Sequence, residues 1–499
     1  MTDTTPADAS APDATSAPSA LPGSQGGRRA VSDILRQIGG RLVNGLLGVV
    51  VAILVARALG EDDFGRWSTL IAIVTLATPL TELGIQQLGV ARAAAQPHHE
   101  PHWLGSLVAV RSALAVAAAI VCLAVSLTVA DGADMRLAAL LLCATLLLSP
   151  VSALGAAFQL RMRNDLGIVV MTVNSVLWTA AVILVATAGG GLVPLAIVFL
   201  GAAVVSTAVE LVLALRMSSV SFSGVRARSR DLVRTGFPLA ISGILVLGYA
   251  RVDQIIVFEA AGERDAGLYG AAYRILDQAS IVPMSVVATL FPVLVAAGAA
   301  ADRGRLRRLV QQSVDGLLTV GLGALAFCVV CGGQLLALLF GDAFEQAGTA
   351  LAVLMAAYGA ICVGYVMGSL VIVFALQRRY LAYAVLGLVF NVGLNLWLVP
   401  RHGFIAAAWI TLATELLVVG LNTRAVLRAM DWRPSPGPVL RAVAAAAVTA
   451  ALLALLKGVD VPIGILVPAA ALLYPTALTA TGALRPRDLI AIARSRGAS

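Results

Sequence analysis

Long apolar runs alternate with short polar turns along almost the whole chain. About 14 of these runs are near the roughly 20 residues that an α-helix needs to cross a bilayer. Membrane-barrel strands would instead alternate in segments of about ten residues, and the sequence shows no such alternation. The pattern predicts an all-α polytopic membrane protein with spans near 35–57, 67–88, 104–129, 136–160, 166–188, 192–215, 234–258, 267–298, 311–332, 347–376, 380–399, 404–427, 440–456 and 462–483.

Composition supports the membrane class. Of the 499 residues 59% are hydrophobic and only 12% are charged, whereas soluble domains carry about 25% charged residues. Residues 1–30 differ, because they are rich in Ala, Pro, Ser, Thr and Asp, and we predict a disordered cytoplasmic tail there. The loops are too short to fold as a catalytic domain outside the membrane. The run at 267–298 is longer than a span requires, and Pro283 and Pro292 are candidate kinks.

The distribution of basic residues predicts the orientation. With the N-terminus in the cytoplasm, 26 of the 35 Lys and Arg fall in cytoplasmic segments, six fall outside and three fall within spans. This bias continues to the C-terminus, so we expect both ends in the cytoplasm. The net charge of +8 then reflects topology and contact with anionic lipid, and no nucleic-acid partner is needed to explain it.

A short acidic turn occurs twice, 202 residues apart. It reads "ALGEDDFGRW" at 58–67 and "AAGERDAGLY" at 260–269, each time between two apolar runs. Predicted helices 1–6 and 7–12 therefore resemble two copies of one unit. Because six is even, both copies enter from the same side, so the repeats are parallel. The predicted regions are an N-lobe at 31–216, a basic linker at 217–233, a C-lobe at 234–430, and two further helices with a cytoplasmic tail at 431–499.

Charged side chains inside the spans are functional candidates, because hydrocarbon tolerates them poorly. The densest group lies on predicted helices 7 and 8. Arg251 is seven residues before the end of one helix and Arg274 is seven residues after the start of the next, so both lie roughly 10 Å below the outer surface. Tyr269, Tyr273 and Asp277 recur at i, i+4 and i+8 on one helix face.

The first copy lacks this charge. At the same offset it carries Val49, Val51, Ala72 and Thr75 in place of Arg251, Asp253, Arg274 and Asp277. Charge in one copy fits a one-sided ligand site, and a guanidinium pair suits phosphate or pyrophosphate. The alternative is that Arg251–Asp253 and Arg274–Asp277 are buried pairs that only neutralise each other.

Three stretches carry a resemblance: "ARALGEDDFGRWSTLIAIV", "YARVDQIIVFEAAGERDAGLYGAAYRI" and "NVGLNLWLVPRHGFIAAAWITLATE". The chain resembles the polysaccharide and O-antigen flippase branch of the multidrug/oligosaccharidyl-lipid/polysaccharide exporter superfamily over roughly residues 32–483. The resemblance implies a V-shaped two-lobe transporter whose helices 1, 2, 7 and 8 line a central cavity. It also implies alternating access and polyprenyl-pyrophosphate-linked glycans as substrates.

We therefore predict a flippase that moves a lipid-linked oligosaccharide from the inner to the outer leaflet of a bacterial cytoplasmic membrane, for cell-surface polysaccharide biosynthesis. Arg251 and Arg274 would hold phosphate, and Tyr269 and Tyr273 would stack on sugar. Expected partners are the glycan lipid, membrane lipids and a polysaccharide polymerase or other surface-glycan machinery.

Alternatives remain within and outside transport. A lipid II flippase and an ion-coupled drug antiporter share the architecture, whereas a membrane glycan polymerase or ligase would need a sizeable outer loop. The chain carries no ATP-binding motif, so we expect an ion gradient, the membrane potential or downstream removal of the product to drive transport. The short loops and the two six-helix units favour a transporter over an enzyme, and we expect no cofactor or metal. H⁺ or Na⁺ coupling would involve Asp253, Asp277 or Glu82.

Overall fold

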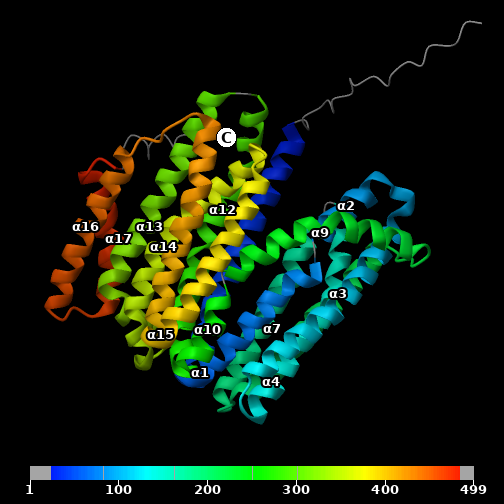
Figure 1. The fold of residues 1–499 in the computed structure, drawn as a ribbon, viewed down its shortest axis with the longest axis horizontal. Helices are drawn as coiled ribbons and strands as arrows, with labels where there is room; N and C mark the ends of the chain where they lie inside the picture. The colour runs from blue at the N-terminus through cyan, green and yellow to red at the C-terminus, as the bar shows by residue number, and fades with distance from the viewer. Residues whose placement is uncertain (1–23, 83, 162, 250, 301, 484–499) are drawn as a thin grey trace, which may run out of the picture.

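The computed structural model describes residues 24–82, 84–161, 163–249, 251–300 and 302–483. These residues form helices and turns without strands, which confirms the all-α prediction (Figure 1). Four short 3₁₀ helices connect longer ones: η1 (Pro97–His99), η2 (Thr145–Leu148), η3 (Ala153–Gly155) and η4 (Asp342–Ala347).

The α-helices fall into two bundles and a flanking pair. The first bundle contains α1 (Ser24–Glu82), α2 (Ile85–Ala95), α3 (Glu100–Val129), α4 (Gly132–Ala144), α5 (Ser149–Ser152), α6 (Ala156–Leu160), α7 (Asn164–Thr187) and α8 (Leu192–Met217). The second contains α9 (Val225–Tyr249), α10 (Val252–Ala261), α11 (Glu263–Ala279), α12 (Ile281–Ala299), α13 (Arg303–Phe340), α14 (Gly348–Val373) and α15 (Gln377–Met430). The flanking pair is α16 (Gly437–Gly458) and α17 (Ile463–Ala480).

Eleven helical segments in the described residues are long and apolar enough to cross a membrane. The two longest, Val50–Ala95 with 46 residues and Gln377–Met430 with 54, are each long enough for two spans. Both contain a non-helical glycine, Gly60 in α1 and Gly403 in α15, where two helices meet. The number 14 stays a prediction, but the expected turns near 58–66 and 400–403 coincide with these glycines.

The two copies of the acidic turn have the same backbone shape. Gly60 has φ 75° and ψ −177°, and Gly262, 202 residues later, has φ 94° and ψ 175°. Side chains with a Cβ rarely adopt a positive φ, so glycine permits the chain to reverse within one residue. This shared conformation supports the internal repeat read from the sequence.

Two helices predicted from the sequence are interrupted: the first break was not predicted, and the second lies just before the candidate kink Pro283. The helix expected at 234–258 is divided into α9 and α10, and Arg251 has non-helical dihedrals. The helix expected at 267–298 is divided into α11 and α12 at Ser280, three residues before Pro283. Pro283 has no N–H and its ring crowds the carbonyl of Ala279, which accounts for the second interruption. Pro292 lies inside α12 without breaking it.

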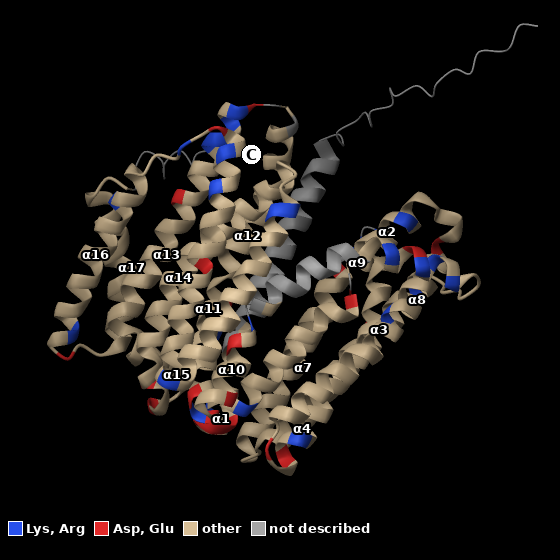
Figure 2. Ribbon diagram, in the orientation of Figure 1, with Lys and Arg blue, Asp and Glu red and all other residues tan. Residues whose placement is uncertain are grey.

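The bundles approach each other where α1 contacts α11, and they splay apart at the opposite ends (Figure 1). This arrangement confirms the V shape. Lys and Arg gather at the splayed ends of both bundles, which we call the basic ends (Figure 2). Helix α9 runs between the bundles, contacting α2 and α3 as well as α15, while α16 and α17 pack on α13.

Two predicted boundaries fall inside helices. Helix α1 begins at Ser24, within the segment 1–30 that we predicted to be a disordered tail, and residues 1–23 lie outside the described residues. Helix α9 begins at Val225, within the predicted linker 217–233. Most of the predicted C-terminal tail, 484–499, also lies outside the described residues.

Candidate functional site

The two lobes meet through small residues at the ends opposite the basic ends. A Cβ added to Gly65 in α1 would collide with the carbonyl oxygen of Glu263 in α11, and a Cβ added to Gly267 would collide with that of Glu61. The contact is reciprocal, because Gly65 and Gly267, like Glu61 and Glu263, are 202 residues apart. The repeated turn therefore brings the two copies into backbone contact.

Ion pairs surround this contact. Arg66 Nε lies 2.8 Å from Glu263 Oε1, and Arg264 Nε lies 3.0 Å from Glu61 Oε1. The side chain of Arg264 is 54% exposed and that of Arg66 is 34% exposed, so each pair is worth at most about 1 kcal/mol. Close backbone packing at the glycines, not charge, must be the larger stabilising term.

The small residues continue inward. A Cβ on Gly270 would lie 2.9 Å from Ser68 Oγ, and these two residues again share the 202-residue offset. We call Gly65, Ser68, Gly267 and Gly270 the glycine seam. Helix α11 therefore approaches α1 over its first two turns with no side chain larger than that of Ser68 within the seam.

Arg274 follows on the same face of α11. Gly267, Gly270 and Arg274 are spaced i, i+3 and i+7, which places them on one side of a helix. One turn further, Gln278 faces Gly48 of α1, because a Cβ added to Gly48 would lie 3.6 Å from Gln278 Nε2. Arg274 thus faces the other lobe, immediately beyond the place where the seam ends.

The guanidinium of Arg274 has no hydrogen bond or ion pair among the described residues, and the residue is half-buried. Asp277, its predicted partner, binds Arg251 instead. Arg251 Nη2 donates to Asp277 Oδ1 at 2.9 Å and Oδ2 at 3.0 Å, and the Arg251 guanidinium lies 5.0 Å from the ring centroid of Tyr273. The structure thus brings Arg251, Tyr273, Arg274 and Asp277 together, and among the described residues it gives the only carboxylate of the group, Asp277, to Arg251 as its contact ion pair.

Asp253 points elsewhere. It is 1% exposed, and its Oδ1 accepts the backbone N–H of Gln254 at 2.8 Å. Its Oδ2 accepts the hydroxyl of Tyr269 at 2.5 Å and that of Thr411 in α15 at 3.1 Å. The predicted Arg251–Asp253 pair is therefore replaced by a buried cluster, in which Thr411 is a member that the sequence analysis missed.

Tyr269 belongs to that buried cluster. Its side chain has no exposed surface, so in this conformation it cannot stack on a sugar. Its ring instead packs against Tyr273, with the centroids 5.5 Å apart. Of the two predicted tyrosines, only Tyr273 adjoins the arginines.

Glu82 lies apart from this group. It forms a 2.6 Å ion pair with Arg111, whose side chain is 3% exposed while that of Glu82 is 54% exposed. The residue equivalent to Arg274 in α1 is Ala72, and Glu82 is ten residues beyond it, about 15 Å along the helix. We call Arg251, Tyr273, Arg274 and Asp277 the arginine site, and the structure does not place Glu82 there.

The break before α10 adds to the site. Arg251 occupies the N-cap position of α10, and the free N–H groups at a helix N-terminus favour anions. Together with the unpaired Arg274, this arrangement can hold an anionic group such as phosphate. The described residues contain no cluster of three or more His, Cys, Asp or Glu that could hold a metal ion.

Sequence comparison points to a polysaccharide biosynthesis family. A family model described as "Polysaccharide biosynthesis protein" matches residues 31–297. The chain is 25% identical over 191 residues to a probable flippase, AglR, of Haloferax volcanii. That match covers 38% of this chain and 40% of the relative, so the chain spans well under half of the relative's length.

Solved structures share the fold. The lipid II flippase MurJ in an inward closed conformation aligns with a TM-score of 0.72 and 11% identity, covering 90% of this chain and 98% of that chain. An inward-facing multidrug resistance MATE family transporter of the MOP superfamily aligns with a TM-score of 0.65 and 16% identity, covering 78% and 94%. At these identities the likeness shows the two-lobe fold alone.

Proposed function

We propose that this chain, which belongs to the polysaccharide biosynthesis protein family, is a flippase that moves a polyprenyl-pyrophosphate-linked oligosaccharide across the membrane. The observation that carries the proposal is Arg274, which has no hydrogen bond or ion pair among the described residues and lies on the interlobe face of α11, just beyond the glycine seam. Two cations that share one carboxylate between two membrane lobes are costly unless an anion or water accompanies them. A pyrophosphate headgroup supplies that anion.

The basic ends face the cytoplasm in this proposal, because cytoplasmic loops are enriched in Lys and Arg. The protein is then a multi-pass cytoplasmic-membrane protein with both termini inside. The lobes splay at the basic ends and meet at the glycine seam, and in this proposal such a state admits substrate from the cytoplasm. The seam is the outer closure.

The headgroup binds through exchange of partners. Arg274 binds one phosphate directly, and Arg251 exchanges Asp277 for the second, while the ring of Tyr273 supports the Arg251 guanidinium. The sugar lies in the hydrated space between the lobes, and the polyprenyl tail stays in lipid. Binding supplies the second negative charge that the two arginines lack, which favours closure of the basic ends around the headgroup.

Opening of the glycine seam then releases the headgroup outside. Asp277 loses its arginine when substrate binds, so it becomes the candidate to take up H⁺ or a cation, and Asp253 is the second candidate. Glu82, which is paired with Arg111, is the third candidate and lies nearer the basic ends than the other two. No bound cofactor is needed. Membrane lipids and a polysaccharide polymerase that consumes the exported unit are the expected partners.

A lipid II flippase is the second candidate, because the MurJ fold covers almost this whole chain and the same arginines suit any lipid-linked pyrophosphate. An antiporter of cationic drugs fits less well, since the site carries two arginines against one facing carboxylate. A membrane polymerase or ligase is the least favoured alternative.

The test uses purified protein in liposomes that contain a polyprenyl-pyrophosphate oligosaccharide labelled on the sugar, with a membrane-impermeant quencher outside. We expect the protein to reduce the fraction of labelled lipid that the external quencher cannot reach. Competition by lipid II then reports how wide the substrate range is. Failure to move any lipid-linked glycan, together with gradient-driven efflux of a cationic dye, would overturn the proposal. Lipid analysis of a deletion strain identifies the glycan that accumulates.

A further inference from the structure

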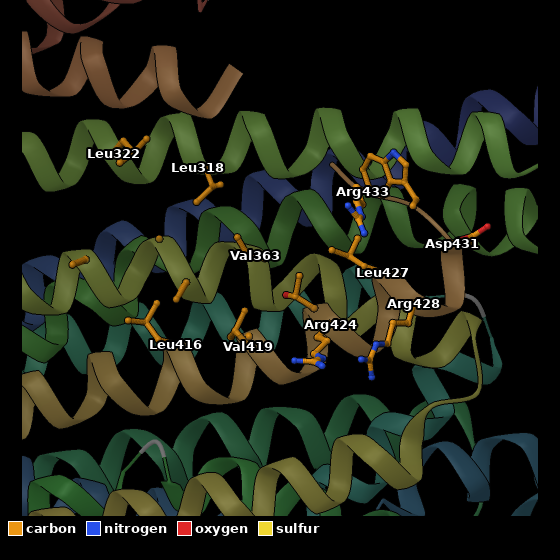
Figure 3. Close-up of a pocket in the computed structure, with 16 residues that line it drawn as sticks. Leu318, Leu322, Val363, Leu416, Val419, Arg424, Leu427, Arg428, Asp431 and Arg433 are labelled. Atoms are coloured by element: carbon orange, nitrogen blue, oxygen red, sulfur yellow. The ribbon is translucent and has the colours of Figure 1, made fainter. Parts of the chain in front are cut away.

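A separate cavity lies in the second lobe. None of the residues that line it belongs to the arginine site. The cavity has a volume of about 890 Å³ and lies between α13, α14 and α15 (Figure 3). Its walls are apolar and include Leu318 from α13, Val363 from α14, and Leu416 and Val419 from α15. Such a surface excludes water and favours a hydrocarbon chain.

The end of this cavity nearest the basic ends is different. Arg424, Arg428 and Arg433 line it together with Asp431 and Trp432. Arg424 and Arg428 are one helical turn apart in α15. All three arginines are exposed, and their side chains make no hydrogen bond or ion pair with any residue that the structure describes. Three cations therefore share one apolar cavity with a single carboxylate.

The segment that carries Arg433 is held in place. Arg307 Nη2 of α13 donates to the carbonyl of Met430 at 3.0 Å and to that of Asp431 at 2.6 Å. The side chain of Gln311 donates to the carbonyl of Ser435 at 3.2 Å and accepts its N–H at 3.0 Å. These four bonds fasten the chain after α15 across the start of α13, so Arg433 is positioned beside the other two arginines.

The dimensions match one bilayer leaflet. Leu416 and Arg428 are twelve residues apart in α15, which is about 18 Å along a helix. Half of the hydrocarbon core is about 15 Å thick. The apolar part, from Leu416 to Arg424, is eight residues or about 12 Å long. With Leu416 near the middle of the bilayer, Arg424 and Arg428 would lie on either side of the level at which the hydrocarbon meets the headgroups.

We propose that this groove binds one anionic phospholipid of the cytoplasmic leaflet, with an acyl chain along α15 and its phosphate among Arg424, Arg428 and Arg433. Basic pockets between membrane helices on this side are known to take anionic headgroups. The positive-inside bias alone would scatter arginines over the loops, whereas here three converge on the mouth of one apolar cavity. The site is distinct from the proposed flippase site and uses none of its residues.

The test measures lipid retained by purified, delipidated protein after exposure to phosphatidylglycerol or phosphatidylcholine, by native mass spectrometry. We expect the wild type to retain phosphatidylglycerol at least tenfold more strongly. The variant with Arg424→Gln, Arg428→Gln and Arg433→Gln should lose this preference. A matched control with Arg305→Gln, Arg378→Gln and Arg379→Gln removes three exposed arginines of the basic ends that do not line the groove, and it should keep the preference.

A second variant tests the apolar part. Gly420 lines the groove, and a Cβ there meets nothing within 4 Å, so Gly420→Phe should fill the space and lower retention of both lipids. Equal loss of preference in the control triple variant would overturn the proposal. So would polyprenyl phosphate displacing phosphatidylglycerol, because the groove would then belong to the transported lipid. Both readouts measure binding, so they stand apart from any failure of flipping.

Discussion

Gly267 of α11 packs directly against the backbone carbonyl of Glu61 in α1, and the equivalent Gly65 packs against Glu263. No side chain fits between these backbones, so the closed state of the seam depends on glycine at both positions. Any larger residue must hold the two lobes apart at this end. The contact can therefore be tested by substitution without touching the arginines.

We expect Gly267→Leu to prevent closure of the seam and to abolish flipping while the protein still inserts. Accessibility reports this directly: with Ser68→Cys as a probe, a membrane-impermeant maleimide should label the Leu variant faster than its parent. The five native cysteines are buried, so background labelling stays low. Gly201→Leu is the matched control, because a Cβ there meets nothing. Unchanged labelling in Gly267→Leu would contradict the proposed closure.

Covalent closure of the seam is the converse experiment. A Cβ on Gly270 would lie 3.0 Å from the Cβ of Ser68, near the 3.5–4.5 Å that disulfides require. The double variant Ser68→Cys with Gly270→Cys should cross-link under oxidation, arrest flipping, and recover when reductant is added. Each single variant should be insensitive to oxidant. Full activity in the cross-linked protein would rule out opening of the seam during transport.

Arg274 and Arg251 should differ in their effect on stability. Arg274 has no described partner, so Arg274→Gln should abolish flipping and leave the melting temperature in detergent nearly unchanged. Arg251→Gln leaves Asp277 partly buried without its cation, so this variant should lower both the flipping rate and the melting temperature. Loss of a partner in a buried pair costs up to about 3–5 kcal/mol. Wild-type flipping by Arg274→Gln would remove that residue from the site.

The buried cluster at Asp253 gives a prediction about folding. Tyr269→Phe removes the hydroxyl that donates to Asp253 and keeps the ring, so it should cost about 1–3 kcal/mol. Thr411→Val, which removes the other hydroxyl donor, should act in the same direction. Thermal unfolding in detergent measures both. If Tyr269→Phe left stability intact but blocked flipping, Tyr269 would belong to the substrate site.

The sequence predicted the helical lobes well because hydrocarbon thickness and loop charge constrain long apolar runs strongly. It placed the turns at Gly60 and Gly403 and the interruption before Pro283, where residue type alone limits the backbone. It did not predict the break at Arg251, since that segment has no proline and its apolar pattern continues unbroken.

Side-chain pairing was less predictable than the fold. Spacing along α10 and α11 favoured Arg251–Asp253 and Arg274–Asp277, but partners across a helix break depend on the angle at which the two helices meet. Thr411, 158 residues from Asp253 along the chain, gave no local signal at all. Its approach is set by the packing of α15 against α10.

A contact in which each copy offers the same glycine and the same carbonyl is what an isologous homodimer interface requires. Each half of this chain therefore carries a self-complementary surface, and a free half could in principle pair with its own twin. In a homodimer, equivalent positions must carry the same residue. Because the two halves are covalently linked, they can differ: position 274 is arginine, whereas the equivalent position 72 is alanine.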